Sequence, residues 1–281
     1  MSTQLRIGTG VNRITGVSEE MFSARVDSME RDRCPQVPIP QVGRRFSVSL
    51  PVRLGDVDSS GRFRLDALTR YTQDVSNDDT SDAALADDLA WVVRRTTVDV
   101  FAPASFQEVL TYTTFCSGLG RRWAERRIAV HGESGAHYEV ATLWVHIDPT
   151  TGRPKQLSSQ FVEIYGEAAG GREVAAKLVH GPVPDGVERR QWPLRVVDFD
   201  VFNHVNNASY WSVVEEVLSE QQPPVAVPYR ATIEYGAGIP PLSEVEVDVS
   251  RTSDGFDAWW IVDGKHPASV SVYELAGQAR A

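Results

Sequence analysis

The stretch of sequence from position 198 to position 211 reads DFDVFNHVNNASYW and precedes a predicted amphipathic helix. The same frame occurs earlier, where residues 53–62 read RLGDVDSSGR. A shift of 142 positions places Arg53 on Arg195, Asp56 on Asp198, Asp58 on Asp200 and Asp74 on Glu216. The first copy has Arg62 where the second has His204. The repeat indicates a duplicated domain in which only one copy carries a titratable imidazole.

Length and composition narrow the class of protein. With 281 residues, 42% of them hydrophobic, the chain can bury one large core or two ordinary ones. No apolar run reaches about 18 residues, so no membrane span is expected, and the N-terminus lacks a signal-peptide pattern. A net charge of −10 argues against nucleic acid as the main partner. Cys34 and Cys116 form neither a disulfide framework nor a zinc spacing, so a cytoplasmic location is expected.

Hydrophobic periodicity predicts the same order of elements in each half: a strand, a long helix, then several strands. In the first half we expect a strand at 46–52, a helix at 65–79, and strands at 91–100, 109–117, 123–130 and 138–147. In the second half we expect a strand at 191–197, a helix from Asn206 or Asn207 to about Glu220, and strands at 230–235, 245–251, 258–262 and 268–273. The pattern R-x-T-V/I-D/E at 95–99 recurs at 230–234.

This order favours an α+β fold in which an antiparallel sheet wraps around each helix. The predicted divisions are a poorly ordered extension at 1–44, a first domain at 45–160, a linker at 161–185, a second domain at 186–275 and a tail at 276–281.

The segment around His204 has the residue types for attack on a carbonyl. A loop that enters a helix leaves its first backbone N–H groups free, and these stabilise a developing oxyanion. His204 could act as a general base on water or as a nucleophile, and Asp200 could orient the imidazole. In the alternative interpretation, Asp200 and Asn206 are turn and cap residues, and His204 packs against the helix end.

The segment 200–210 resembles the signature of hot-dog-fold thioesterases, and the tandem arrangement resembles the acyl-ACP thioesterases of plants and bacteria. Further similar segments lie at 89–95, 143–146, 153–157 and 232–235, so the resemblance covers about residues 45–275. It implies two tandem hot-dog domains that form a pseudo-dimer, and hydrolysis of acyl-ACP or acyl-CoA thioesters in fatty acid biosynthesis. It implies no metal and no cofactor. The sequence leaves open whether two chains form a homodimer.

The chain departs from that family pattern at two places. The plant pattern is Asp-x-Asn-x-His followed by a glutamate after the helix; here Phe202 takes the Asn position, and the Glu position falls on Gly238. The resemblance thus assigns Asp200 and His204 as catalytic residues, and Asn203 as a replacement amide. Two other acids are further catalytic candidates: Asp74 on the facing helix and Glu234 on a later strand. In the alternative interpretation, Asp74 is a solvated helix residue and Glu234 is an outward-facing strand carboxylate.

A basic run at 121–127 is a candidate surface for an acidic carrier protein. Its arginines are Arg121, Arg122, Arg126 and Arg127. A solvated hairpin explains it equally.

Two other functions remain open. One is an acyl-thioester hydratase or dehydratase, although hot-dog hydratases use a different local motif. The other is an inactive acyl-carrier or acyl-CoA binding protein, which Phe202 and Gly238 favour.

Overall fold

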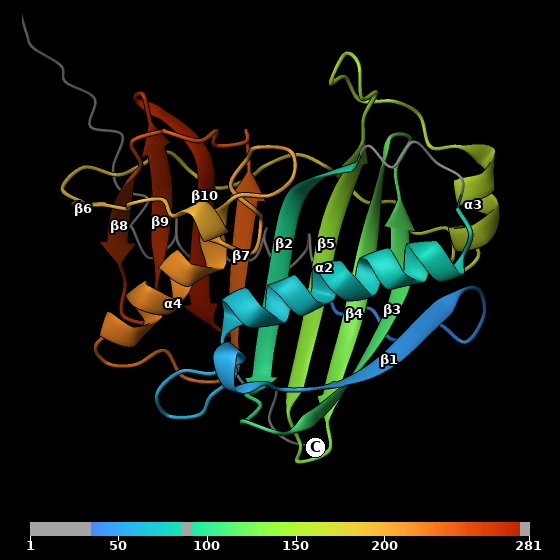
Figure 1. Ribbon diagram of the computed structural model, residues 1–281, viewed down its shortest axis with the longest axis horizontal. Helices are drawn as coiled ribbons and strands as arrows, with labels where there is room; N and C mark the ends of the chain where they lie inside the picture. Colours follow the sequence, from blue (N-terminus) through green and yellow to red (C-terminus); the bar gives the residue numbers. More distant parts are fainter. Residues whose placement is uncertain (1–34, 86–90, 276–281) are drawn as a thin grey trace, which may run out of the picture. The chain divides into compact units, whose positions relative to one another are not determined.

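A computed structural model describes residues 35–85 and 91–275, and shows an antiparallel sheet with helices on one face (Figure 1). The sheet has ten strands in the order β1-β3-β4-β5-β2-β7-β10-β9-β8-β6. The first five strands are β1 (Arg45–Pro51), β2 (Trp91–Ala102), β3 (Val109–Leu119), β4 (Trp123–Gly132) and β5 (His137–His146). The others are β6 (Glu188–Gln191), β7 (Tyr229–Tyr235), β8 (Glu246–Arg251), β9 (Gly255–Val262) and β10 (Lys265–Glu274).

Three α-helices accompany the sheet in the described part of the chain: α2 (Leu65–Asp82), α3 (Ser159–Tyr165) and α4 (Tyr210–Glu220). In Figure 1, α2 lies across β2 to β5 and α4 lies across β8 to β10. Both helices bury an apolar stripe, with Leu68 and Val75 of α2 and Trp211 and Val214 of α4 fully enclosed. These side chains join one hydrophobic cluster with the sheet, which places the core between the helices and the strands.

Most predicted strands and helices are confirmed to within a few residues; one predicted strand is wrong, and one helix was not predicted. The strand expected at 191–197 is a four-residue strand, β6, followed by a 3₁₀ turn at Val196–Asp198. Pro193 lies between them and cannot donate to a ladder. Helix α3 overlaps the start of the predicted linker at 161–185; its N-cap Ser158 accepts a hydrogen bond from the N–H of Phe161 at 3.1 Å. Seven residues are too few for periodicity to reveal a helix.

Some expectations fall outside this description. Most of the predicted extension at 1–44, and the tail at 276–281, lie outside the described residues. Within residues 35–85 and 91–275, none of the helices combines the length and the apolar character of a membrane span.

The two five-strand groups meet where β2 pairs with β7. The register places Arg95 opposite Glu234, Thr97 opposite Thr232 and Asp99 opposite Arg230. Arg230 binds the Asp99 carboxylate through Nε and Nη2 at 2.5 and 2.7 Å, and the two threonine hydroxyls lie 3.1 Å apart. Arg95 and Arg230 are repeat equivalents, and each faces the acidic residue of the other repeat, Glu234 or Asp99, so the pairing is reciprocal.

Candidate active site

The loop that carries the sequence motif is shaped by Asp200. Its Oδ1 accepts hydrogen bonds from the backbone N–H groups of Phe202 at 2.9 Å and His204 at 3.3 Å. The N–H of Asp200 in turn donates to the carbonyl of His204 at 2.9 Å. Asn203 adopts φ +58°, a left-handed conformation that asparagine tolerates better than most residues. The side chain of Asp200 thus closes a tight turn.

The first copy of the motif forms the same turn, contact for contact. Asp58 Oδ1 accepts from the N–H of Ser60 at 2.8 Å and of Arg62 at 3.0 Å, and the N–H of Asp58 donates to the Arg62 carbonyl at 2.9 Å. Gly61, at φ +86°, takes the place of Asn203. Because a loop without an imidazole keeps the same aspartate, the turn-forming role of Asp200 is independent of His204.

His204 is exposed, and its ring lies against Gly238. A Cβ added at Gly238 would approach the His204 Cγ to 2.8 Å. Gly238, where the plant pattern has a glutamate, therefore lies beside the imidazole and carries no side chain. The contacts of the described residues include no hydrogen bond between Asp200 and the imidazole, and Asp200 Oδ1 accepts from main-chain N–H groups. The expectation that Asp200 orients the imidazole directly stays a prediction.

Asn203, the expected replacement amide, has an exposed side chain on the turn, and its N–H donates to the carbonyl of Asp200 at 3.1 Å. Its catalytic role stays a prediction. Another amide, Asn207, lines a pocket between α2 and the sheet. Its carbonyl accepts a hydrogen bond from the hydroxyl of Tyr235 at 3.2 Å, and that hydroxyl accepts one from Trp211 Nε1 at 3.2 Å.

That pocket is small and partly open to solvent. Polar side chains from α2, β2 and β5 contribute much of its wall: Thr69, Thr72, Gln73, Ser76, Thr96 and Thr142. Val93, Trp144 and Trp211 add apolar surface. The pocket therefore has a mixed polar and apolar wall between α2 and the sheet.

Gln73 of α2 lines this pocket, whereas its neighbour in sequence, the candidate acid Asp74, is exposed and does not. Burial and the neighbouring Asp78 raise the pKa of Asp74, while Arg70 opposes the shift. The sequence indicates Asp74 as a candidate acid, but the 142-residue offset places Gln73, not Asp74, on Glu215, and this equivalence is the signal that identifies Gln73.

Glu215 shows what the equivalent position does in the first loop. Its carboxylate binds the Arg62 guanidinium through both oxygens, and its Oε1 accepts from the N–H of Leu65 at 2.5 Å. Leu65 is the first residue of α2, so a negatively charged oxygen occupies the entrance of that helix. The repeat equivalents of Arg62, Leu65 and Glu215 are His204, Asn207 and Gln73.

Comparison with known families gives matches to both halves of the chain. The acyl-ACP thioesterase N-terminal domain matches residues 43–165, and the acyl-ACP thioesterase C-terminal domain matches residues 184–269. The chain belongs to the acyl-ACP thioesterase family. Two uncharacterized proteins of Mycobacterium tuberculosis strains are 32% identical to it over 202 residues, which is 71% of this chain and 80% of theirs.

Solved structures with the same fold include members of this family. A 12:0-ACP thioesterase from Umbellularia californica matches with a TM-score of 0.69 at 18% identity, over 83% of this chain and 97% of that one. A putative oleoyl thioesterase from Lactobacillus plantarum matches with a TM-score of 0.68 at 18% identity, over 85% of this chain and 100% of that one. The family is one of thioester hydrolases, and its substrates are acyl-ACP thioesters.

For an acyl-ACP thioesterase the predicted carrier surface at 121–127 needs correction. Arg121 and Arg122 are exposed, but Arg126 and Arg127 are not. Arg126 forms an ion pair with the buried Asp79, and its Nη1 lies 3.1 Å from the hydroxyl of Thr114. Alternation along β4 turns successive side chains to opposite faces, so a run of basic residues in a strand does not form one surface.

Arg127 is 1% exposed and pairs with Glu125 at 3.4 Å. Glu125 also accepts a hydrogen bond from Arg172 at 2.7 Å. Although burial alone would raise it, Arg127 and Arg172 hold the pKa of Glu125 below its ordinary value. These arginines therefore compensate a buried carboxylate rather than contact a carrier protein.

The candidate acid Glu234 and the thiol of Cys116 are both buried. Glu234 is 2% exposed, and its carboxylate accepts hydrogen bonds from the backbone N–H groups of Val179 and His180 at 2.7 to 2.9 Å. It anchors the segment that joins the two halves to β7. Cys116 is buried, and burial raises the pKa of its thiol to about 11, which keeps it in the unreactive protonated form.

Proposed function

We propose that the chain hydrolyses acyl-ACP thioesters at the entrance of α4, with His204 as the general base. The observation that carries this proposal is the replacement of the Arg62–Glu215 ion pair of the first loop by His204 and Gln73 in the second. The two loops otherwise share their turn geometry. An ion pair fills one helix entrance, whereas a titratable imidazole and a neutral amide occupy the equivalent positions at the other.

The backbone N–H of Asn207 is our candidate donor for the oxyanion. Its equivalent, the N–H of Leu65, binds a carboxylate oxygen of Glu215 at 2.5 Å. The first loop therefore demonstrates that an N–H at this position can bind a negatively charged oxygen. At the α4 entrance Gln73 brings no charge, so the same position is available to a thioester oxygen. Loss of one such donor in other enzymes typically lowers kcat by about 10²–10³-fold.

In the proposed reaction, His204 removes a proton from water, and the water oxygen bonds to the thioester carbonyl carbon. The carbonyl oxygen becomes an oxyanion that the N–H of Asn207 stabilises. When the intermediate collapses, the carbon–sulfur bond breaks and the imidazolium returns its proton to the departing thiolate. Asp200 acts as a positioning residue, because its hydrogen bonds set the turn that presents His204. Asn203 supports that turn through its left-handed backbone.

We also propose that residues 45–160 and 186–275 are two hot-dog domains related by a pseudo-two-fold axis. The reciprocal register of β2 and β7 supports this arrangement, as does the mirrored strand order on either side of that pair. The axis passes near Thr97 and Thr232, which are repeat equivalents and lie opposite each other. Two cysteines without a disulfide pattern are consistent with a cytoplasmic location.

A hydrolysis assay tests the proposal. The parent protein is assayed with acyl-ACP and acyl-CoA substrates of several chain lengths, and free thiol is measured. His204→Ala should lower kcat by about 10²–10⁴-fold, the usual contribution of a general acid–base group. Because His204 is exposed, the variant should unfold at the same temperature as the parent. His266→Ala, at another exposed histidine, serves as the matched control.

Three outcomes would contradict the proposal. Hydrolysis by His204→Ala at the parent rate would place the base elsewhere. Binding of acyl-ACP by the parent without thiol release would indicate a carrier-binding protein. A change in enoyl absorbance without thiol release would indicate a hydratase.

A further inference from the structure

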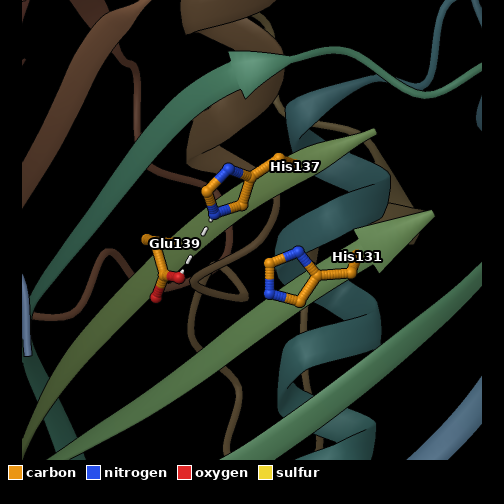
Figure 2. Close-up of side chains that lie close together, drawn as sticks. All are labelled: His131, His137 and Glu139. Carbon is orange, nitrogen blue, oxygen red and sulfur yellow. Dashed lines mark hydrogen bonds and ion pairs between the residues drawn. The ribbon is translucent and has the colours of Figure 1, made fainter. Parts of the chain in front are cut away.

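Three potential metal ligands meet on the sheet far from the catalytic loop in sequence (Figure 2). They are His131 of β4 and His137 and Glu139 of β5. The candidate ligand atoms of the three side chains all lie within 4.8 Å of one another. Figure 2 shows the two imidazoles and the carboxylate converging over these two neighbouring strands. None of the three takes part in the proposed thioester hydrolysis.

Strand geometry explains why the three side chains share a face. His137 and Glu139 are two residues apart in β5, so they point to the same side of the sheet. His131 is the direct cross-strand partner of His137. The intervening Tyr138 is 1% exposed and packs edge-on against Phe63 in the core under α2. The cluster therefore lies on the face of the sheet opposite α2.

We propose that His131, His137 and Glu139 bind one divalent transition-metal ion of the Zn²⁺ class. Two imidazoles and a carboxylate are a donor set that suits Zn²⁺, Ni²⁺ or Cu²⁺, whereas Mg²⁺ and Ca²⁺ prefer oxygen ligands alone. Three protein ligands leave a fourth tetrahedral position for water. The site would join β4 to β5 on the outer face, independently of the acyl-thioester chemistry.

The spacing of the three side chains is compatible with a bound ion after side-chain rotation. In a tetrahedral site, Zn–N and Zn–O bonds of about 2.0–2.2 Å place two ligand atoms about 3.3–3.6 Å apart. The ligand atoms lie within 4.8 Å of one another here, so side-chain rotations must bring them closer. His137 Nε2 already lies 3.4 Å from Glu139 Oε1. The two imidazole centroids are 4.7 Å apart.

A neighbouring ring restricts one of the proposed ligands. The ring of Phe101 stacks on the imidazole of His137, with the ring centroids 4.6 Å apart, and limits the orientations of that imidazole. A ligand whose orientation is already restricted loses less conformational freedom when it binds an ion.

Titration calorimetry with ZnCl₂ tests the site. The full-length protein is treated with EDTA, dialysed and titrated, and one equivalent of Zn²⁺ should bind, with no competition from MgCl₂. His131→Ala, His137→Ala and Glu139→Gln should each weaken binding at least about tenfold. His266→Ala and His204→Ala, which change histidines outside the cluster, should bind Zn²⁺ as the parent does.

A second measurement separates binding from folding. Zn²⁺ should raise the unfolding temperature of the parent but not of His131→Ala, which alters an exposed side chain. Thioesterase activity should be the same in the parent and in His131→Ala. The proposal is overturned if the parent binds no Zn²⁺ at micromolar concentrations, or if the two histidine variants bind it with unchanged affinity.

Discussion

His204 and Arg62 occupy equivalent positions in two loops of the same shape. The guanidinium of Arg62 is held by Asp58 at 3.0 Å and by Glu215, so it acts as a fixed structural cation. The imidazole of His204 is exposed beside Gly238. The two loops thus differ at this position: the arginine of the first loop is ion-paired at a helix entrance, whereas the histidine of the second loop can accept and donate a proton.

A substitution at Gln73 tests whether the facing helix α2 contributes to catalysis. Gln73→Ala should lower kcat for acyl-ACP by about 10–10³-fold, if the amide orients the thioester beside the Asn207 N–H. Asp74→Ala, at the adjacent exposed position, should leave kcat unchanged. Steady-state kinetics on both variants measure the difference. Equal activity of Gln73→Ala and the parent would limit Gln73 to lining the pocket.

Helix α4 contributes to its neighbour as well as to its own site. Glu215 is largely buried, and its carboxylate accepts hydrogen bonds from the first N–H of α2 and from the Arg62 guanidinium. Although burial alone would lower it, Glu215 holds the pKa of the Arg62 guanidinium above its ordinary value. The entrance of α2 is therefore capped by a side chain from another helix, because Arg64 at its own N-cap position makes no side-chain cap hydrogen bond.

Removal of that cap should cost stability. Glu215→Gln should lower the free energy of unfolding by about 1.5–3 kcal/mol, the range for hydrogen bonds to charged groups. Glu216→Gln, on the exposed side of the same helix, should change it by less than about 0.5 kcal/mol. Urea denaturation of the two variants provides the comparison. A stability equal to that of the parent in Glu215→Gln would show that the carboxylate charge contributes nothing at this entrance.

The molecule as a whole carries a net charge of −10, so its encounter with an acidic carrier protein requires a local positive region. Burial removes Arg126 and Arg127 from that role. Arg121 and Arg122, at the exposed turn between β3 and β4, remain available.

Charge reversal at this turn tests the carrier surface. Arg121→Glu combined with Arg122→Glu should raise KM for acyl-ACP, and the defect should shrink as salt screens charges beyond about 8–10 Å. KM for acyl-CoA should change little. Lys265→Glu, at the exposed first residue of β10, is the control. Equal losses on both substrates would instead implicate the turn in folding or in a pantetheine channel.

Much of this architecture follows from the sequence alone. The 142-residue repeat of the Asp-x-Asp turn indicated the duplication, since a turn requires only local hydrogen bonds and a residue that tolerates positive φ. The R-x-T-V/I-D/E repeat likewise contained the partners that face each other across β2 and β7. Strand and helix periods predicted most of the elements, because alternate burial on a sheet and a stripe on a helix leave a direct pattern in the chain.

Only the tertiary structure decided which neighbours in sequence share a site. It placed Gln73 rather than Asp74 at the pocket, buried Arg126 and Arg127 against carboxylates, and engaged Asp200 with main-chain N–H groups. It also brought His131 beside His137 and Glu139 through the register of a hairpin. These outcomes depend on helix rotation, strand register and the pairing of buried charges. Such long-range packing is not encoded in the spacing of residues along one segment.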